Sequence, residues 1–189
     1  MDNDIELMLR AKSGDDGAFS ELMRRHYRGV VNYIYRYTNL RENSEDLAQE
    51  VFLRIYRSRK NYRPEAKFST WLYKIATNVS LTHVKKKNNN MSLDEINDGT
   101  GDVEDSALEV ADDLIYRKEI KDVIFQAMES LPERERAAIM LCKYEGLSYE
   151  ETAEVLECTV GAVKAYVHRG RMKLIDRLKP YLTGGEHGM

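Results

Sequence analysis

The sequence predicts an all-α protein of two small helical domains joined by a flexible acidic linker, with a helix-turn-helix in the C-terminal domain. Three observations predict this fold class. Apolar residues in nearly every segment recur three or four positions apart, as on one face of a helix, and no segment alternates convincingly as a strand would. Three prolines and eleven glycines among 189 residues are few for an all-β chain full of turns. Acidic residues gather in one central block.

Charge divides the chain into three parts. Residues 1–87 carry 17 Lys and Arg against 11 Asp and Glu, a net charge of +6. Residues 88–115 carry nine acidic residues and no Lys or Arg, and they include few large apolar side chains. Residues 116–189 carry 12 residues of each sign. We therefore expect domains at 1–87 and 116–182, a flexible acidic linker at 88–115, and a flexible tail at 183–189.

Three helices are expected in the N-terminal domain. Apolar spacing over 15–38 predicts the first of them. The second is expected to open near Asn43 and Ser44, because both residue types are good N-caps. Pro64 then breaks the chain, and the third helix is expected from Phe68 into a short run of lysines.

The segment 148–179 has the organisation of a helix-turn-helix. Ser148 and Glu151 form a capping-box pattern, so a short helix is expected to begin there. A tight turn is expected near Glu157–Thr159, and a longer helix from Val160. One face of the longer helix is apolar, and the opposite face carries small and basic residues that suit contact with DNA. An amphipathic helix with a solvated basic face is the plainer alternative, but the paired helices and the turn favour DNA binding.

A second candidate surface lies on the helix that begins at Phe68. Trp71, Asn78 and Lys85 stand seven residues apart and therefore share a face, with Lys74 beside them. An aromatic ring, an amide and two lysines on one line suit the bases and backbone of a single strand. The preceding loop adds basic residues and an aromatic ring. In the alternative reading Trp71 is a partly buried core residue and Asn78 a surface amide, and a tryptophan can fill both roles.

These segments resemble those of the extracytoplasmic-function (ECF) sigma factors, which belong to the sigma-70 family of bacterial RNA polymerase. The resemblance covers almost the whole chain and rests on three segments in order. Residues 44–57 read SEDLAQEVFLRIYR, residues 68–78 read FSTWLYKIATN, and residues 131–171 read LPERERAAIMLCKYEGLSYEETAEVLECTVGAVKAYVHRGR. The resemblance implies that they dock on the polymerase clamp helices, melt and read the −10 promoter element, and bind the −35 element, respectively. It also implies that the acidic linker enters the polymerase cleft, imitating nucleic-acid charge.

The resemblance assigns roles to particular residues. Those expected to dock on core polymerase are Asp46, Gln49, Glu50 and Phe52. Those expected to contact the single-stranded −10 element are Tyr62, Arg63, Trp71, Lys74, Asn78 and Lys85, with Asn78 holding a flipped base. Those expected at the −35 duplex are Lys164, Ala165, Tyr166, His168, Arg169 and Arg171. Ala165 and Tyr166 replace polar and basic residues common in relatives, which predicts a different −35 preference, and the role of His168 stays open.

The function expected is that of a promoter-specificity subunit rather than an enzyme. Its expected partners are core RNA polymerase (clamp helices and flap), promoter DNA and an anti-sigma factor. No metal or cofactor is expected, because the four histidines and two cysteines lack metal-ligand spacing and no P-loop or triad-like motif occurs. We expect a cytoplasmic protein without membrane insertion, since no apolar run approaches the roughly 20 residues of a membrane span and the acidic N-terminus has no signal-peptide stretch.

Two alternatives stay open at the level of sequence. A stand-alone helix-turn-helix regulator would explain 148–179, but it would leave the N-terminal surface and the docking segment without a role. An enzyme would need a catalytic constellation that these residues do not suggest. A redox role is an alternative for Cys158 in the turn. Packing as a small buried apolar side chain is the favoured interpretation for both Cys158 and Cys142.

Overall fold

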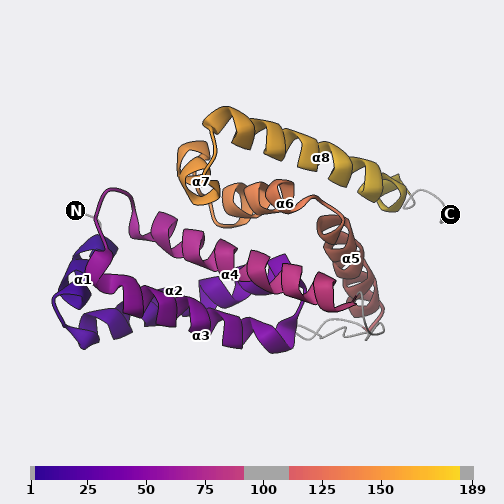
Figure 1. Cartoon of the computed structure of the whole chain (residues 1–189). Coiled ribbons are helices and arrows are strands. Elements are labelled where there is room, and N and C mark those ends of the chain that lie inside the picture. The colour runs from indigo at the N-terminus through magenta and orange to yellow at the C-terminus, as the bar shows by residue number, and fades with distance from the viewer. Residues whose placement is uncertain (1–2, 92–110, 184–189) are drawn as a thin grey trace.

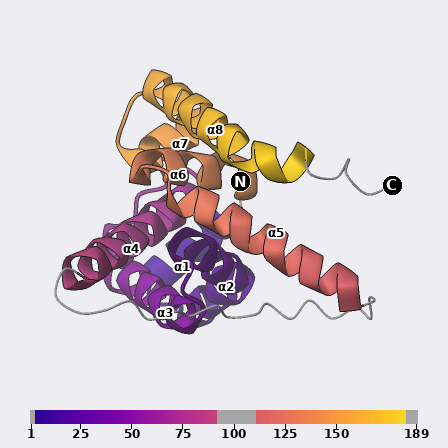
Figure 2. The same cartoon turned by 90° about the vertical axis from the view of Figure 1, so that its right-hand side faces the viewer.

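The computed structural model describes the backbone of residues 3–91 and 111–183, with side chains for 3–86 and 120–181. Every element in these ranges is helical, which confirms the all-α prediction. Helices α1 to α4 form one bundle, and α5 to α8 form a second group that lies across α4 (Figure 1). Figure 2 shows α5 extending beside the first bundle, where it contacts α2.

The first bundle consists of α1 (Asn3–Lys12), α2 (Asp16–Thr38), α3 (Arg41–Ser58), the 3-10 turn η1 (Arg59–Asn61) and α4 (Phe68–Met91). Helix α2 begins at the cap residue Asp15, whose carboxylate accepts a hydrogen bond from the Ala18 N–H at 3.0 Å. It ends at Asn39, which takes a left-handed conformation with φ 55°. Tyr33 and Phe68 are fully buried among the helices and centre the core.

Helix α3 begins at Arg41, two to three residues before the start predicted at Asn43 and Ser44. Ser44 does not cap the helix, because its side chain is buried and its hydroxyl donates to the Leu40 carbonyl within the first turn. Leu40 occupies the N-cap position of α3, and its N–H donates a hydrogen bond to the Thr38 hydroxyl at 3.3 Å. A tertiary position for Ser44 therefore replaces the capping role that its residue type suggested.

The second group consists of α5 (Ala111–Glu129), α6 (Glu133–Ile139), the π-helical turn η2 (Met140–Tyr144), α7 (Tyr149–Leu156) and α8 (Val160–Thr183). The predicted capping box is present: the Ser148 hydroxyl accepts from the Glu151 N–H at 3.1 Å, and the Glu151 carboxylate accepts from the Ser148 N–H at 2.8 Å. Glu157 ends α7 in a left-handed conformation with φ 50°. These features confirm the helix-turn-helix and the start of its second helix.

The expected acidic linker, 88–115, lies mostly outside the described residues. Within the described part, α4 continues to Met91 and α5 begins at Ala111, so helices extend into both ends of that range. The predicted tail also lies outside, apart from the last residue of α8.

A buried arginine joins the two groups. Arg136 on α6 is 6% exposed, and its Nη1 donates to the Tyr37 carbonyl of α2 at 3.1 Å. Its guanidinium also lies 5.4 Å from the centroid of the Tyr37 ring, and the Tyr37 hydroxyl donates to the Glu133 carbonyl at 3.3 Å. Because these hydrogen bonds cross the boundary and are shielded from water, they help to fix how the two groups meet, although the Arg136 Nε itself has no hydrogen-bond partner.

Candidate nucleic-acid interface

The predicted residues of α4 do share an outer face of that helix. Asn78 and Lys85 are exposed, and Trp71 and Lys74 are half-buried. The Trp71 ring packs against Tyr62 and Phe68, with ring centroids 5.1 and 6.3 Å away. Trp71 thus packs against the core and is also partly exposed, so both roles considered for it stay open and its contact with a base stays a prediction.

The structure places the two loop residues differently from one another. Arg63 is exposed and lies 3.8 Å from the Glu65 carboxylate. Tyr62 is 2% exposed, so its ring supports Trp71 from beneath and offers no free face on which a base could stack. The direct base contact expected of Tyr62 therefore does not fit this arrangement.

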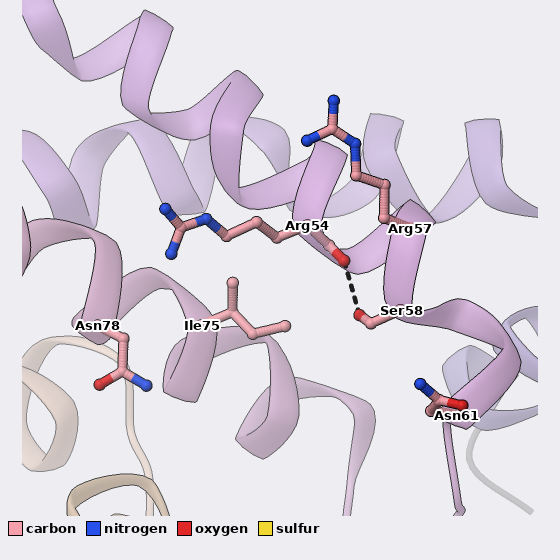
Figure 3. A pocket seen from close by; sticks show the side chains of 6 residues that line it. All are labelled: Arg54, Arg57, Ser58, Asn61, Ile75 and Asn78. Atoms are coloured by element: carbon pink, nitrogen blue, oxygen red, sulfur yellow. Dashed lines mark hydrogen bonds between the residues drawn. The ribbon is translucent and has the colours of Figure 1, made fainter.

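A pocket of about 450 Å³ lies between α3 and α4 and is lined by Arg54, Arg57, Ser58, Asn61, Ile75 and Asn78. Figure 3 shows Ile75 at its centre, with Arg54 above it and Asn78 and Asn61 toward opposite ends. Its wall thus offers an apolar patch, two amides and two cations, the groups that bind a flat polar ring beside a phosphate. Of the residues lining it, Asn78 is among the contacts predicted from the sequence. Arg54 lies one turn before Arg57 on α3, a spacing that is visible in the sequence.

The expected polymerase-docking residues occupy one helix, α3, but not one face. Asp46 and Gln49 are exposed, Glu50 is half-buried, and Phe52 is 3% exposed in the core against Tyr27. Leu53 lies one residue on and is 47% exposed, although it is a large apolar residue. It completes a stripe at i, i+3, i+4 and i+7 that is formed by Asp46, Gln49, Glu50 and Leu53. Within this stripe, a hydrogen bond from Arg54 lowers the pKa of Glu50 below its ordinary value.

The second helix of the helix-turn-helix buries Val163 and Val167 and turns basic residues outward. Lys164, His168, Arg169 and Arg171 are exposed, and Ala165 and Tyr166 are half-buried. The Arg169 guanidinium lies 5.3 Å from the centroid of the Tyr166 ring, so Tyr166 supports a neighbouring cation as well as the helix packing. The structure brings together all six residues predicted for the −35 duplex on α8.

Three lysines of the first bundle pair with glutamates of the second group. We call Lys67, Lys74 and Lys85 the lysine row; they lie 2.8, 2.8 and 3.5 Å from the carboxylates of Glu151, Glu157 and Glu133, respectively. Hydrogen bonds from Lys67 and Lys74 lower the pKa values of Glu151 and Glu157. Exposed ion pairs of this kind are individually weak. Together they mask lysine charges beside the outer face of α4.

A less exposed contact accompanies the lysine row. The Tyr73 hydroxyl of α4 donates a hydrogen bond to the Glu145 carboxylate, which follows η2. Burial raises the pKa of Glu145 above its ordinary value, while the Tyr73 hydrogen bond and the Arg36 charge oppose that rise. The Arg36 guanidinium lies 5.0 Å from the Tyr144 ring at the same boundary. This cluster holds a half-buried carboxylate where the two groups meet.

Replacing Tyr73 with Phe is expected to raise the pKa of Glu145 further, because the hydrogen bond that favours its ionised form is removed while burial persists. A carbon-detected NMR titration of the Glu145 carboxyl group measures this value. Burial outweighs the hydrogen bond and favours the protonated carboxyl, so the closed arrangement is most stable below a pH of about 4.5 and loses stability as the pH rises through the raised pKa of Glu145. A fall of the Glu145 pKa to its ordinary range in Tyr73→Phe would contradict the buried contact.

The described residues contain no group of three or more His, Cys, Asp and Glu side chains placed to hold a metal ion. Within the same residues, none of the helices combines the length and the apolar character that a membrane crossing needs. Cys142 and Cys158 are free and half-buried. The Cys142 sulfur lies 3.2 Å from the Thr152 hydroxyl, and burial raises the pKa of its thiol.

Comparisons with known proteins match both halves of the chain. The family Sigma-70 region 2 matches residues 22–90, and the family Sigma-70, region 4 matches residues 121–174. The RNA polymerase sigma-H factor of Pseudomonas aeruginosa is 31% identical over 186 residues, which cover 96% of each protein. The ECF RNA polymerase sigma-E factor of Escherichia coli strain K12 is 30% identical over 184 residues, which cover 95% of this chain and 96% of that protein.

Two solved structures share the fold. The structure of CnrH in complex with the cytosolic domain of CnrY matches with a TM-score of 0.71 at 23% identity, covering 95% of this chain and 99% of that one. The sigma factor RpoE in complex with the anti-sigma factor NepR from Bartonella quintana matches with a TM-score of 0.66 at 19% identity, covering 85% of this chain and 96% of that one. The fold, the two family matches and the relatives of similar length agree. The chain therefore belongs to the sigma-70 family as an ECF sigma factor, a promoter-specificity subunit of RNA polymerase.

Proposed function

We propose that this chain docks on core polymerase through α3, traps an unpaired −10 base beside α4 and reads the −35 duplex with α8. The observation that carries the proposal is the pocket between α3 and α4, where Asn78 meets two arginines and an apolar floor. In this role the chain catalyses no chemical step, uses no metal or cofactor and acts in the cytoplasm. Its work is to bind and to open promoter DNA.

Capture of the −10 base follows from the chemistry of the pocket. An asparagine amide both donates and accepts, so Asn78 suits the Watson–Crick edge of an unstacked base. Ile75 provides an apolar surface for the ring, and Arg54 and Arg57 provide charge for the flanking phosphates. Trp71, supported by the buried Tyr62, offers a stacking surface for a neighbouring base. Arg63, Lys74 and Lys85 add attraction along the strand.

Docking on polymerase is proposed for the exposed stripe of α3. Its acidic and amide groups (Asp46, Gln49 and Glu50) suit the basic clamp helices, and the exposed Leu53 supplies an apolar anchor at the centre of such a contact. Phe52 acts beneath this stripe as part of the core that keeps α3 in place. A second contact with the flap is proposed for the C-terminal domain, as the ECF family implies.

DNA binding at the −10 element requires the two groups of helices to separate. The lysine row is paired with glutamates of α6, α7 and the turn after α7, so a DNA backbone would have to compete with these carboxylates in this arrangement. We propose that core polymerase opens this arrangement and that an anti-sigma factor opposes the use of this chain by core polymerase. Family membership supports the anti-sigma factor, and RpoE is an example of a sigma factor solved with one bound.

Coelution with core polymerase tests the proposal against a stand-alone helix-turn-helix regulator. The full chain is mixed with core polymerase and separated by size-exclusion chromatography, and Leu53→Asp serves as the docking variant. Leu9→Asp is not suitable as a control, because Leu9 packs against the core. The wild-type chain is expected to coelute, and the Leu53→Asp chain to elute alone while it stays folded. A wild-type chain that binds duplex DNA but never coelutes with polymerase would contradict the proposal.

Replacing Arg169 with Ala is expected to weaken duplex binding by the holoenzyme about tenfold and to lower the slope of log K against log salt by about 1. The reason is the loss of an exposed cation from the DNA-facing side of α8. Fluorescence anisotropy with a promoter duplex over a series of salt concentrations measures both quantities. Lys121→Ala, which removes a charge from exposed α5, serves as the control. An unaltered slope would remove Arg169 from the phosphate contacts.

A further inference from the structure

A buried carboxylate lies between α6 and α8, beneath the DNA-facing side of α8. Glu135 is 5% exposed, and its two oxygens accept hydrogen bonds from the Arg169 Nε at 3.0 Å and the Lys173 Nζ at 2.9 Å. Burial raises the pKa of Glu135, but the hydrogen bonds from Lys173 and Arg169 outweigh it and hold the pKa below its ordinary value. Glutamates are rarely this buried unless they are paired, and here both partners come from one helix face.

Gly170 permits the close approach that this contact needs. A Cβ atom built on Gly170 would lie 2.5 Å from the Ile139 Cδ1 and 3.5 Å from the Glu135 Cβ. A side chain at this position would require the Ile139 side chain to shift. The two helices lie side by side along this contact in Figure 1. Arg169 and Lys173 lie one turn apart on either side of Gly170, so the carboxylate of Glu135, which lies beneath the glycine, reaches both.

The contact restricts Arg169 without hiding it. The Arg169 Nε is held by Glu135, and the guanidinium lies 5.3 Å from the Tyr166 ring centroid, yet 52% of the side chain is exposed. A guanidinium has five N–H donors, and this bond engages one of them, so the outer edge stays able to bind a phosphate or a base. An arginine otherwise loses considerable rotamer freedom on binding, and a side chain held in place beforehand avoids most of that loss.

We propose that Glu135 is a positioning residue that orients Arg169 for specific contact with the −35 duplex, while Lys173 holds the other oxygen of the same carboxylate. The inference rests on the proposed function of α8 and adds a residue outside the helix-turn-helix to its specificity. A purely structural role would tie α8 to α6 and affect stability alone. A purely electrostatic role would act through the charge of Glu135 on every duplex equally.

The sign of the effect separates these roles. Removing a negative charge beneath a DNA-binding face should tighten binding to any duplex, because repulsion of the phosphates is lost. Loss of positioning should instead weaken binding to the preferred sequence while leaving other sequences unchanged or tighter. The informative quantity is therefore the ratio of specific to non-specific affinity.

The test uses the holoenzyme, formed from the full chain and core polymerase. The −35 element that the wild type prefers is first selected from random duplexes. Specific and non-specific affinities are then compared for wild type, Glu135→Gln and the matched control Glu129→Gln, which removes the same charge from an exposed position of α5. We expect the ratio to fall about tenfold in Glu135→Gln and to stay unchanged in Glu129→Gln. Equal ratios for the two variants would overturn the positioning role.

Further variants protect the test from misfolding and from indirect effects. Gly170→Ala keeps every charge but crowds the contact between α8 and α6 at Ile139 and Glu135, so it is expected to lower the ratio as well. In an Arg169→Ala background, Glu135→Gln is expected to cause no further loss; an undiminished loss there would show that Glu135 acts by another route. A wild-type holoenzyme that selects no duplex element would overturn the −35 role of α8 itself, whereas selection that is indifferent to Glu135 would overturn this inference alone.

Discussion

Replacing Asn78 with Ala is expected to reduce promoter opening by the holoenzyme about tenfold or more, while binding to core polymerase stays unchanged. Asn78 is exposed and lines the pocket between α3 and α4, so its loss removes the amide that would satisfy a flipped base but removes nothing from the core. A lost amide–base pair typically costs about 1–3 kcal/mol, and 1.4 kcal/mol corresponds to a factor of ten. Permanganate footprinting of unpaired thymines in the −10 region measures the opening directly.

The matched control is Asn43→Ala, which removes an exposed amide from the start of α3, outside the pocket. It is expected to leave permanganate reactivity as in the wild type. Both variants are expected to coelute with core polymerase, so that a defect in opening is separated from a defect in docking. Unchanged reactivity in Asn78→Ala would contradict the capture of a base at this pocket.

Reversing the charges that face the lysine row is expected to open the chain in the absence of polymerase. In Glu133→Lys with Glu157→Lys, the attraction to Lys85 and Lys74 becomes repulsion at separations that are now 3.5 and 2.8 Å. We expect the open fraction to rise roughly tenfold, since each pair is weak but both change sign. Small-angle scattering should then show a larger radius of gyration, and a −10 single strand should bind more tightly.

The control for this experiment is Glu150→Lys with Glu154→Lys. It makes the same change in net charge on exposed residues of α7, and Glu150 matches Glu133 because each lies in the first turn of its helix. The added positive charge alone should tighten strand binding equally in both double variants. Equal affinities and equal radii for the two would contradict a closed arrangement held by the lysine row.

Local signals predicted most of the fold. The capping box at Ser148 and the turn at Glu157 depend on residues within one helical turn, and both occur where the sequence placed them. The start of α3 was displaced because Ser44 turns into the core, which is a tertiary effect.

The candidate site was predictable on single helices and not between them. The outer face of α4 follows from seven-residue spacing, so Trp71 and Asn78 were found. The facing wall of the pocket was missed, because Arg54 and Ser58 reach it only when α3 packs beside α4. Burial of Phe52 and Tyr62 likewise depends on that packing, which residue type and spacing do not encode.

The contacts across the surface where the two groups of helices meet had no signal in the sequence. A glutamate on α7 and a lysine before α4 look like ordinary solvated charges until the fold brings them within 2.8 Å. The partnership of Glu135 with Arg169 is hidden for the same reason, since 34 residues separate them. Long-range charge pairs, like the packing of α3 beside α4, thus belong to the part of this molecule that its structure reveals and its sequence does not.

Transcription by core polymerase from a library of random promoters tests the promoter-specificity function most directly. With the full chain added, transcripts are expected to start at a fixed distance downstream of one shared pair of −35 and −10 elements. Core polymerase alone is expected to show no such preference. Start sites that share no elements, or that match those of core polymerase alone, would contradict the function.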